Sequence, residues 1–424
     1  MRILWLVNVV LPVISQEMGE KINPRGGWLI DFSKQLQTDD KYDLFVLFPY
    51  SGNQSVSGVV DRLSYYGFNR KYKDPTKYDI SLEDEFVKVI KNFHPDIIHV
   101  WGTEYIHTLS MVKASQSLNL RNCVVISIQG LVSIISQHYL SGIPCEIQKR
   151  ITLYNLYKKA INLSSEQEQF RKRGLNEIEA IKNVNHIIGR TNWDKVCTTQ
   201  INPDATYHHC NENLRDNFYN YQWDYDKCNK HTILMSQAEY PIKGLHFLLC
   251  ALPLILNKFP ETRLEIAGKN IIKNDSLIDI LKLSSYGKYI SSLIRRNNLI
   301  ERVTFLGNLS ENDMVRSYLK ANVFVSPSTI ENSPNSVGEA MLLGVPVVSS
   351  NVGGVQDMLT HPDEGFLYQH DAPYMLAHCV CELFNNKHLT EEISKNARKH
   401  ALETHDRSSN FQQLIRIYES ISQS

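Results

Sequence analysis

Short runs rich in Val, Ile and Leu, separated by longer stretches with helical spacing, recur along the whole chain. Strands of this kind, apolar on both faces, are typical of parallel sheets that are covered by helices on each side. We therefore expect an α/β protein made of two Rossmann-like domains, each with a doubly wound parallel sheet. The predicted strands lie at 2–10, 43–49, 96–101, 123–128 and 185–190 in the first half, and at 232–237, 264–268, 303–307, 323–328 and 346–350 in the second.

A polar, tyrosine-rich stretch at 202–230 has no sustained period and separates the two sets of strands, as an interdomain connection does. We therefore assign residues 1–215 to an N-terminal domain and residues 216–405 to a C-terminal domain. Residues 406–424 have a helical spacing of apolar side chains, and we expect this helix to pack back on the N-terminal domain. In such sheets ligands bind beyond the carboxyl ends of the strands, so two facing domains would form a cleft.

The charge and hydropathy of the sequence argue against a nucleic-acid partner and against a membrane-spanning segment. Lys and Arg number 45, and Asp and Glu also number 45, so no net charge attracts nucleic acid. The apolar run at the N-terminus is short and lacks a small-residue cleavage site, and no stretch approaches the roughly 18 apolar residues of a membrane span. We expect a cytoplasmic protein that is soluble or peripheral to a membrane.

The eight cysteines are scattered, and the one close pair is a CxC within a helical pattern. This spacing matches neither a zinc site nor a disulfide framework, so we expect reduced thiols and no metal site. The cysteines are Cys123, Cys145, Cys197, Cys210, Cys228, Cys250, Cys379 and Cys381.

Residues 326–358 (SPSTIENSPNSVGEAMLLGVPVVSSNVGGVQDM) carry the densest set of local signals, which predict a strand, a loop, a helix and a second strand. Ser333 and Pro334 are typical of a helix N-cap and first turn, and Gly344 is typical of a helix end. Because this helix would start at the end of a strand, its free N–H groups would form an anion site. The residues that supply them are Asn335, Ser336 and Val337.

Two glutamates accompany this helix, Glu331 in the loop before it and Glu339 within it. A carboxylate beside a bound phosphate is repulsive unless it accepts hydroxyl hydrogens, so the pair indicates a ligand with sugar hydroxyls. The alternative is that both glutamates only complement the positive end of the helix dipole, a frequent role for acidic residues near a helix start. These two residues alone leave both interpretations open.

The spacing of Glu331 and Glu339 within PSTIENSPNSVGEAMLLGVPVVSSNVGG resembles the donor-site signature of glycosyltransferase family four, the retaining enzymes of GT-B architecture. The similarity continues through VTFLGNLSENDMVRSYLKANVFVSPS at 303–328 and IKGLHFLLCALPLI at 242–255. It implies an N-terminal acceptor domain and a C-terminal donor domain that face each other across a cleft. The implied activity is metal-independent, cofactor-free transfer of a sugar, with retention, from a nucleotide-diphosphate sugar. The implied acceptor is a saccharide or lipid-linked saccharide of surface polysaccharide or glycoconjugate synthesis.

The resemblance also assigns roles to single residues. Glu331 and Lys243 would be the catalytic residues, since the carboxylate would contact the donor sugar and the ammonium would offset charge on the leaving diphosphate. Lys243 stands at a helix start, where a cation opposes the helix dipole unless an anion is bound. The remaining donor contacts are implied for Glu339 at the ribose, for the backbone of Asn335, Ser336 and Val337 at the diphosphate, and for Gly307 and Asn308 at the base.

The sequence departs from the family pattern in two places. Relatives carry an arginine a few residues before the lysine, whereas Ala238 stands in this region, and Arg25 is a candidate to replace that arginine. Many relatives carry a histidine where the strand VVISIQG ends at Gln129. Since glutamine takes no proton, the leaving phosphate is expected to accept the proton of the acceptor.

In the N-terminal domain, Gly26 and Gly27 precede a predicted helix. The resemblance implies that they form a loop facing the donor phosphates and the acceptor, and an ordinary turn is the alternative. Strand-end residues suit a sugar acceptor when they combine rings with hydrogen-bonding groups, although packing roles are equally open. These acceptor candidates are Gln129, Trp101, Glu104, His107 and His138.

Residues 149–182 combine Lys and Arg with apolar and aromatic side chains. They suit peripheral contact with an anionic membrane, and a solvated helix pair is the alternative. Two other functions are also open: a nucleotide-sugar epimerase or hydrolase of the same architecture, and an inactive nucleotide-binding module. Donor turnover without an acceptor would favour the first, and donor binding without transfer would favour the second.

Overall fold

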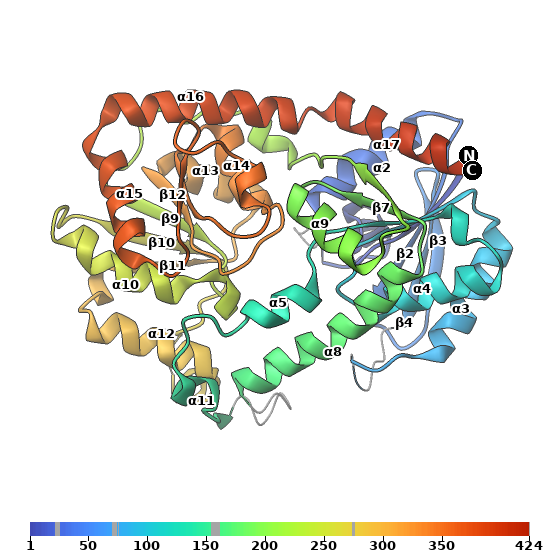
Figure 1. The fold of residues 1–424 in the computed structure, drawn as a ribbon, viewed down its shortest axis with the longest axis horizontal. Coiled ribbons are helices and arrows are strands. Elements are labelled where there is room, and N and C mark those ends of the chain that lie inside the picture. The colour runs from blue at the N-terminus through green and yellow to red at the C-terminus, as the bar shows by residue number, and fades with distance from the viewer. Residues whose placement is uncertain (22–25, 70–73, 75, 154–161, 274–275, 424) are drawn as a thin grey trace. The chain divides into compact units, whose positions relative to one another are not determined.

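The computed structural model describes residues 1–21, 26–69, 74, 76–153, 162–273 and 276–423 (Figure 1). The chain forms two compact units. The first consists of residues 1–134, 170–214 and 405–424, and the second consists of residues 135–169 and 215–404. Within the described ranges, every helix is too short or too polar to traverse a lipid bilayer.

The first unit is built on an eight-stranded sheet in the order β3-β4-β2-β1-β5-β6-β7-β8. Neighbouring strands are parallel except β3 and β4, which run antiparallel at one edge. The strands are β1 (Arg2–Leu6), β2 (Asp43–Tyr50), β3 (Val56–Val60), β4 (Leu63–Asn69), β5 (Ile97–Trp101), β6 (Val124–Ser127), β7 (His186–Gly189) and β8 (Thr206–His209).

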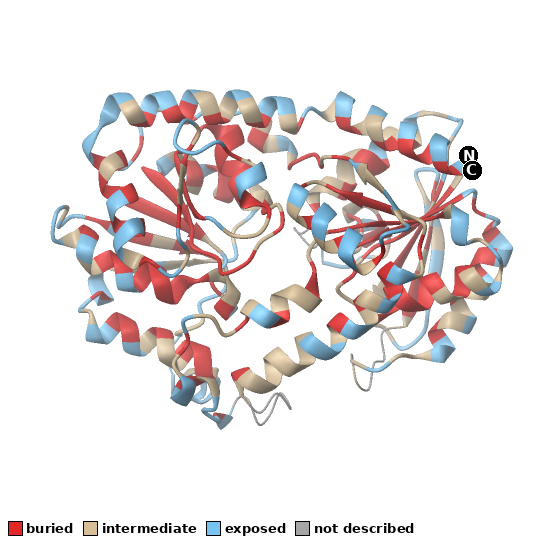
Figure 2. Ribbon diagram, viewed as in Figure 1, coloured by how far each residue is buried: buried red, intermediate tan, exposed pale blue. Residues whose placement is uncertain are grey.

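Apolar clusters cover both faces of this sheet, because alternate residues of a strand point to opposite sides. Leu4 and Leu6 of β1 join one cluster, whereas Ile3 and Trp5 join the other. The central strands of both units are accordingly buried (Figure 2). The helices of this unit are α1 (Pro12–Glu17), α2 (Gly27–Thr38), α3 (Ile80–Phe93), α4 (Ile106–Ser117), α9 (Asn192–Ile201) and α17 (Arg407–Ser422), and the division between units falls within α5 (Val132–His138) and α8 (Leu163–Lys182).

The second unit is built on a six-stranded parallel sheet in the order β11-β10-β9-β12-β13-β14. Numbered within the unit, this is the order 3-2-1-4-5-6 of a Rossmann fold, which reverses direction between β9 and β12. The strands are β9 (Thr232–Ser236), β10 (Arg263–Ala267), β11 (Val303–Gly307), β12 (Val323–Ser326), β13 (Val347–Ser350) and β14 (Phe366–Tyr368). The helices are α6 (Cys145–Gln148), α10 (Leu245–Leu256), α11 (Leu277–Leu281), α12 (Ser285–Arg296), α13 (Glu311–Lys320), α14 (Asn335–Leu343), α15 (Pro373–Asn385) and α16 (Lys387–Thr404).

The structure confirms the predicted fold class, because both units are α/β with doubly wound sheets. The sequence prediction missed β3, β4, β8 and β14, and it interpreted the residues of β8 only as part of the connection at 202–230. Three of these strands, β3, β8 and β14, lie at sheet edges. An edge strand has one unpaired side and needs no continuous apolar run, so its pattern is weaker than that of a central strand.

The structure assigns residues 135–169 to a different domain than the sequence prediction, which placed them in the N-terminal domain. In the structure this segment belongs to the second unit. Ile143, Ile147 and Leu163 join the apolar cluster of that unit, which explains why the segment is part of it. A boundary based on composition alone does not detect a segment that leaves one unit and returns to it.

Helix α17, at the C-terminus, packs on the first unit. The indole N–H of Trp5 donates to the hydroxyl of Tyr418 at 3.0 Å, and this hydroxyl lies 2.6 Å from Nδ1 of His99. Nε2 of His99 lies 2.6 Å from the hydroxyl of Ser127. Burial holds the pKa of His99 well below its ordinary value, so the ring is neutral and one nitrogen accepts while the other donates. This buried chain of hydrogen bonds ties α17 to three neighbouring strands.

Candidate functional site

β9 and β12 are neighbours in the middle of the second sheet, and the chain leaves both at the same edge. After β9 it forms a 3₁₀ turn, η3 (Pro241–Lys243), before α10, and after β12 it forms the loop 327–334 before α14. The two segments touch, since the backbone N–H of Thr329 donates to the carbonyl of Ile242 at 2.8 Å. The residues after these two strands therefore cluster where the strand order reverses, which is the usual ligand position in this fold class.

Two glycines allow the backbone segments around this cluster to approach each other closely. Gly244 has a φ of +71°, and a Cβ atom there would lie 1.7 Å from the carbonyl oxygen of Pro327. Gly353 has a φ of +54°, and a Cβ atom there would lie 1.9 Å from the carbonyl oxygen of Glu331. Because only glycine combines this conformation with the absence of a Cβ atom, both positions determine how the loops pack around Glu331.

Lys243 and Glu331 form an ion pair, although they are far apart in the sequence. The ammonium Nζ lies 2.6 Å from Oε1 of Glu331, and the hydroxyl of Ser328 donates to the same oxygen at 2.8 Å. The side chains are 22% and 15% exposed, so both retain access to a ligand. Lys243 is the last residue of η3 and lies before α10 rather than in its first turn, as the sequence had indicated. A cation near a helix start opposes the helix dipole, and the carboxylate of Glu331 compensates this charge.

Helix α14 starts one residue later than predicted. Pro334 is its N-cap and Asn335 its first residue, whereas the sequence indicated Ser333 as the cap. The backbone N–H of Val337 donates to the carbonyl of Pro334 at 2.9 Å, which corrects the prediction that this N–H group is free. The N–H groups of Asn335 and Ser336 meet no acceptor among the described residues, so they remain the anion-binding donors.

Glu339 lies within α14 and is buried, with 5% of its surface exposed. Nε and Nη2 of Arg215 donate to its two carboxylate oxygens at 2.7 and 2.8 Å. Burial raises the pKa of Glu339, and the charge of Arg215 acts in the opposite direction. The sequence analysis missed Arg215, because an isolated arginine in a polar connection carries no motif that links it to a helix 124 residues later.

The other predicted residues of this unit lie near the ends of strands or, for His138, at the end of helix α5. Gly307 is the last residue of β11, with a φ of +75°, and Asn308 follows it on the surface. His138 was assigned to the N-terminal domain but lies in the second unit, where its carbonyl accepts from the Thr329 hydroxyl at 3.1 Å. Burial lowers the pKa of its imidazole. Ala238, which stands near the expected arginine, is fully buried and contributes to the core.

In the first unit, Gly26 and Gly27 lie at the start of α2. Gly26 is the N-cap with a φ of +85°, and Gly27 is the first residue of the helix. A Cβ atom at Gly26 would lie 2.6 Å from a methyl group of Val9, so close packing after β1 also requires glycine there. Arg25, the candidate for the missing phosphate contact, lies outside the described residues.

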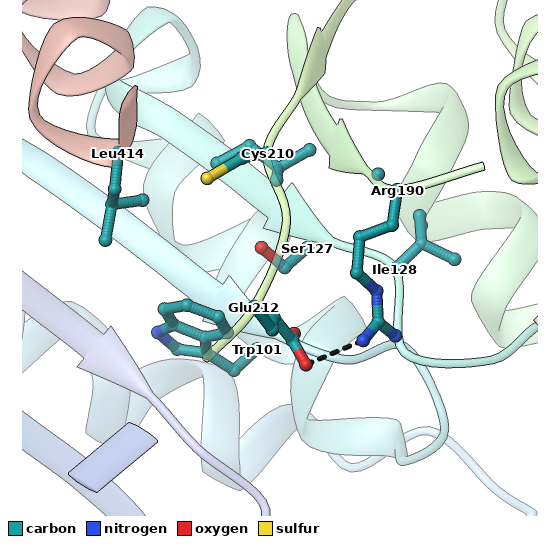
Figure 3. Close-up of a pocket in the computed structure, with 9 residues that line it drawn as sticks. Trp101, Ser127, Ile128, Arg190, Cys210, Glu212 and Leu414 are labelled. Carbon is teal, nitrogen blue, oxygen red and sulfur yellow. Dashed lines mark hydrogen bonds and ion pairs between the residues drawn. The ribbon is translucent and has the colours of Figure 1, made fainter. Parts of the chain in front are cut away.

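Gln129 follows β6 and contacts the ion pair of Arg190 and Glu212. Figure 3 shows this ion pair. Its amide donates to Oε1 of Glu212, whose other oxygen accepts from Nη1 of Arg190 at 2.7 Å. The side chains of Arg190 and Glu212 are 7% and 5% exposed. The sequence analysis did not identify either partner of this pair. The pocket beside it is lined by Trp101, Ser127, Ile128, Ile188, Gly189, Arg190, Cys210, Glu212 and Leu414.

Trp101 and His107 are buried, which agrees with the packing role that the sequence left open beside acceptor binding. The Trp101 ring stacks on His99 with centroids 4.0 Å apart, and Nε2 of His107 lies 2.7 Å from Oδ1 of Asn8. Glu104 is partly exposed and accepts from Nδ2 of Asn8 at 2.9 Å. Desolvation raises the pKa of Glu104 to about 7, so this acceptor candidate titrates near neutral pH.

The groups around the start of α14 suit a ligand that is both anionic and rich in hydroxyls. Within the described part of the chain, no three His, Cys, Asp or Glu side chains are grouped so that they could hold a metal ion. Free N–H groups and the Lys243 ammonium suit an anion, while Glu331 and Glu339 are oriented acceptors for hydroxyls. Each glutamate also pairs with a cation, in addition to lying near the start of the helix.

Residues 222–400 match the model of a protein family described as Glycosyl transferases group 1. The putative glycosyltransferase YtcC of Bacillus subtilis is 28% identical over 182 residues, which are 42% of this chain and 43% of that protein. The uncharacterized glycosyltransferase MJ1607 of Methanocaldococcus jannaschii is 27% identical over 176 residues, which are 42% of this chain and 41% of that protein. The similarity therefore spans less than half the length of these curated relatives.

Solved structures are similar over nearly the whole chain. Sucrose-phosphate synthase from Thermosynechococcus elongatus has a TM-score of 0.71, covering 99% of this chain and 98% of that one at 14% identity. HepE of Anabaena, in complex with UDP and glucose, has a TM-score of 0.69, covering 99% and 100% at 19% identity. At this level of identity the likeness establishes the fold, which is the GT-B architecture of two Rossmann-like units.

The close approach of Gly353 to Glu331 yields a prediction about stability. Gly353→Ala places a methyl group against a backbone oxygen, whereas Gly307→Ala adds it at a similar positive φ with no atom within 4 Å. Both variants incur backbone strain, so Gly353→Ala is expected to lose about 1–3 kcal/mol more unfolding free energy than Gly307→Ala. Urea denaturation measures the difference, and equal losses would contradict the tight packing of this loop.

Proposed function

Because residues 222–400 match the glycosyl transferases group 1 family model, we propose that the chain transfers a sugar from a nucleotide-diphosphate sugar to a saccharide or lipid-linked acceptor. The observation that carries this proposal is the cluster of Lys243, Glu331 and Glu339 around the first turn of α14. It combines anion-binding and hydroxyl-binding groups within one unit, at the point where the strand order reverses.

The diphosphate of the donor is held by the backbone of Asn335 and Ser336 and by Lys243. The ammonium has three N–H donors, of which Glu331 takes one, so two remain for phosphate oxygens. When the bond between sugar and phosphate breaks, negative charge grows on the leaving diphosphate. Lys243 and the positive end of the α14 dipole offset this charge, so the proposed reaction needs neither a metal nor another cofactor.

Glu331 contacts the donor sugar. Its Oε1 accepts from Lys243 and Ser328, while Oε2 has no partner among the residues that the structure describes. Oε2 accepts a sugar hydroxyl, and its negative charge stabilises the positive charge that develops at the anomeric carbon. We further propose that transfer proceeds with retention and that the leaving phosphate takes the acceptor's proton, since Gln129 takes none.

The acceptor is proposed to bind to the first unit, where Gly26, Gly27, Glu104 and Gln129 lie near the carboxyl ends of strands. Acceptors of surface polysaccharide or glycoconjugate synthesis agree with the resemblance in sequence. We place the enzyme in the cytoplasm, with peripheral membrane contact through residues 149–182 when the acceptor is lipid-linked. Residues 154–161 of this segment lie outside the described residues.

Incubation of the full chain with a panel of nucleotide sugars, followed by mass spectrometry, tests the proposed function. We expect binding of a nucleotide sugar, and release of the nucleoside diphosphate only when a suitable saccharide acceptor is present. Rapid donor turnover without any acceptor would instead support a hydrolase or epimerase. Donor binding without transfer to any member of a broad acceptor panel would support an inactive nucleotide-binding module.

Two variants separate the proposed roles of Lys243 and Glu331. Lys243→Ala removes a charge-assisted bond worth about 1.5–3 kcal/mol, so the nucleoside diphosphate should bind about ten- to a hundredfold more weakly. Glu331→Gln should lower kcat far more than it lowers affinity for the nucleoside diphosphate, because its partner is the reacting sugar. Calorimetric titration and steady-state kinetics measure the two effects.

Lys227→Ala is the matched control, because this lysine lies in the same unit, has 82% of its side chain exposed and pairs with nearby Asp224. It removes the same charge without touching the cluster, so its diphosphate affinity should equal that of the wild type. Equal weakening by Lys227→Ala and Lys243→Ala would show that net charge, rather than the cluster, governs binding. Equal losses of affinity and kcat in Glu331→Gln would contradict the role of Glu331.

A further inference from the structure

We propose that Arg215 is a positioning residue that gives this enzyme its preference for ribonucleotide donors, by holding the Glu339 carboxylate toward the ribose hydroxyls. The inference rests on the proposed function, in which Glu339 binds the ribose of the donor. It adds a residue outside every motif of the donor domain. Arg215 begins the longer of the two segments of the second unit, directly after Leu214, the last residue of a segment of the first.

The contact between Arg215 and Glu339 fixes the plane of the carboxylate. Nε and Nη2 of the guanidinium donate in parallel to Oε1 and Oε2, at 2.7 and 2.8 Å. The two side chains are only 19% and 7% exposed. Because a bidentate pair of this kind constrains rotation as well as position, Arg215 determines where the remaining lone pairs of Glu339 point.

The pair leaves Glu339 able to bind a diol. An ionised carboxylate has about four sites for hydrogen-bond donors, and Arg215 occupies two of them. The other sites can accept two neighbouring hydroxyls, which is the arrangement of the 2′ and 3′ positions of ribose. Arg215 thus orients the acceptor atoms of Glu339 without touching the ribose itself.

Arg215 is in turn held in place by the elements around the start of α14. Its guanidinium lies over the ring of Phe218, 4.6 Å from the centroid, and the Phe218 ring meets Tyr318 edge to face at 5.8 Å. The hydroxyl of Tyr318 donates to the carbonyl of Ser336 at 2.9 Å, in the first turn of α14. These contacts link the position of Arg215 to the helix turn that holds the diphosphate in the proposed function.

The charge of Arg215 supports the same role. Burial raises the pKa of Glu339, and the nearby carboxylate of Glu311 acts in the same direction, whereas Arg215 lowers it. A protonated Glu339 would present a hydroxyl donor where the ribose needs an acceptor. Arg215 therefore favours the ionised form of Glu339, which accepts hydroxyl hydrogens, in addition to fixing its orientation.

Calorimetric titration of the full chain tests the inference with two ligands, the nucleoside diphosphate that it binds and the 2′,3′-dideoxy analogue of that ligand. Wild-type protein should prefer the ribonucleotide by about ten- to a hundredfold, the value of a hydrogen bond to a charged group. Arg215→Gln should bind the two ligands with affinities that differ by less than about threefold, which is no more than a weak hydrogen bond contributes. Arg215→Lys keeps the positive charge but cannot make the two parallel hydrogen bonds to Glu339, so it should give an intermediate ratio of affinities.

Two further variants identify the source of the effect. Arg215→Gln combined with Glu339→Gln should have the same ratio as Glu339→Gln alone, because the arginine acts only through the glutamate. Arg316→Gln is the matched control, since this arginine of the same unit is 72% exposed and pairs with Asp313. Its ratio should equal that of the wild type.

A folded Arg215 variant that binds more weakly but keeps the wild-type ratio would overturn the inference, since a merely structural role weakens both ligands alike. If Arg215→Gln does not fold, the affinity ratio of Arg215→Lys replaces it: a ratio below the wild-type value supports the inference, and an unchanged ratio overturns it. Failure of the proposed function gives a different result: wild-type protein would bind no nucleoside diphosphate, or would bind both analogues equally. Either result would remove the basis of the inference as well.

Discussion

The candidate site depends on the pairing of two carboxylates with two cations beside the first turn of α14. Glu331 is paired with Lys243 and Glu339 with Arg215, at distances of 2.6 to 2.8 Å. Removing a carboxylate from water is costly, and an unpaired buried carboxylate would take up a proton. Each pair therefore compensates the charge of a glutamate and fixes its orientation.

The strand order of the second sheet brings these groups together. Lys243 follows β9 and Glu331 follows β12, which are neighbours in the sheet although the two residues are 88 positions apart in the chain. Gly244 and Gly353 let the connecting segments approach within contact of the loop that carries Glu331. The architecture thus supplies the positions, while a small number of charged side chains and glycines supply the chemistry.

The sequence alone predicted the central strands and α14, because local patterns indicate them. A motif also indicated Lys243, Glu331 and Glu339 as site candidates, and the structure places Lys243 and Glu331 in one ion pair. The sequence did not predict Arg215, since its partner lies 124 residues away and no motif marks this arginine. The edge strands and the allocation of residues 135–169 were missed for a related reason: they depend on contacts between distant segments rather than on local periodicity.

A crystal structure of the full chain with the nucleoside diphosphate that it binds is the most direct test of the central claim. We expect the diphosphate to lie within hydrogen-bonding distance of the backbone N–H groups of Asn335 and Ser336 and of Lys243, with the ribose hydroxyls on Glu339. A nucleotide bound elsewhere, with the start of α14 filled only by water, would contradict it.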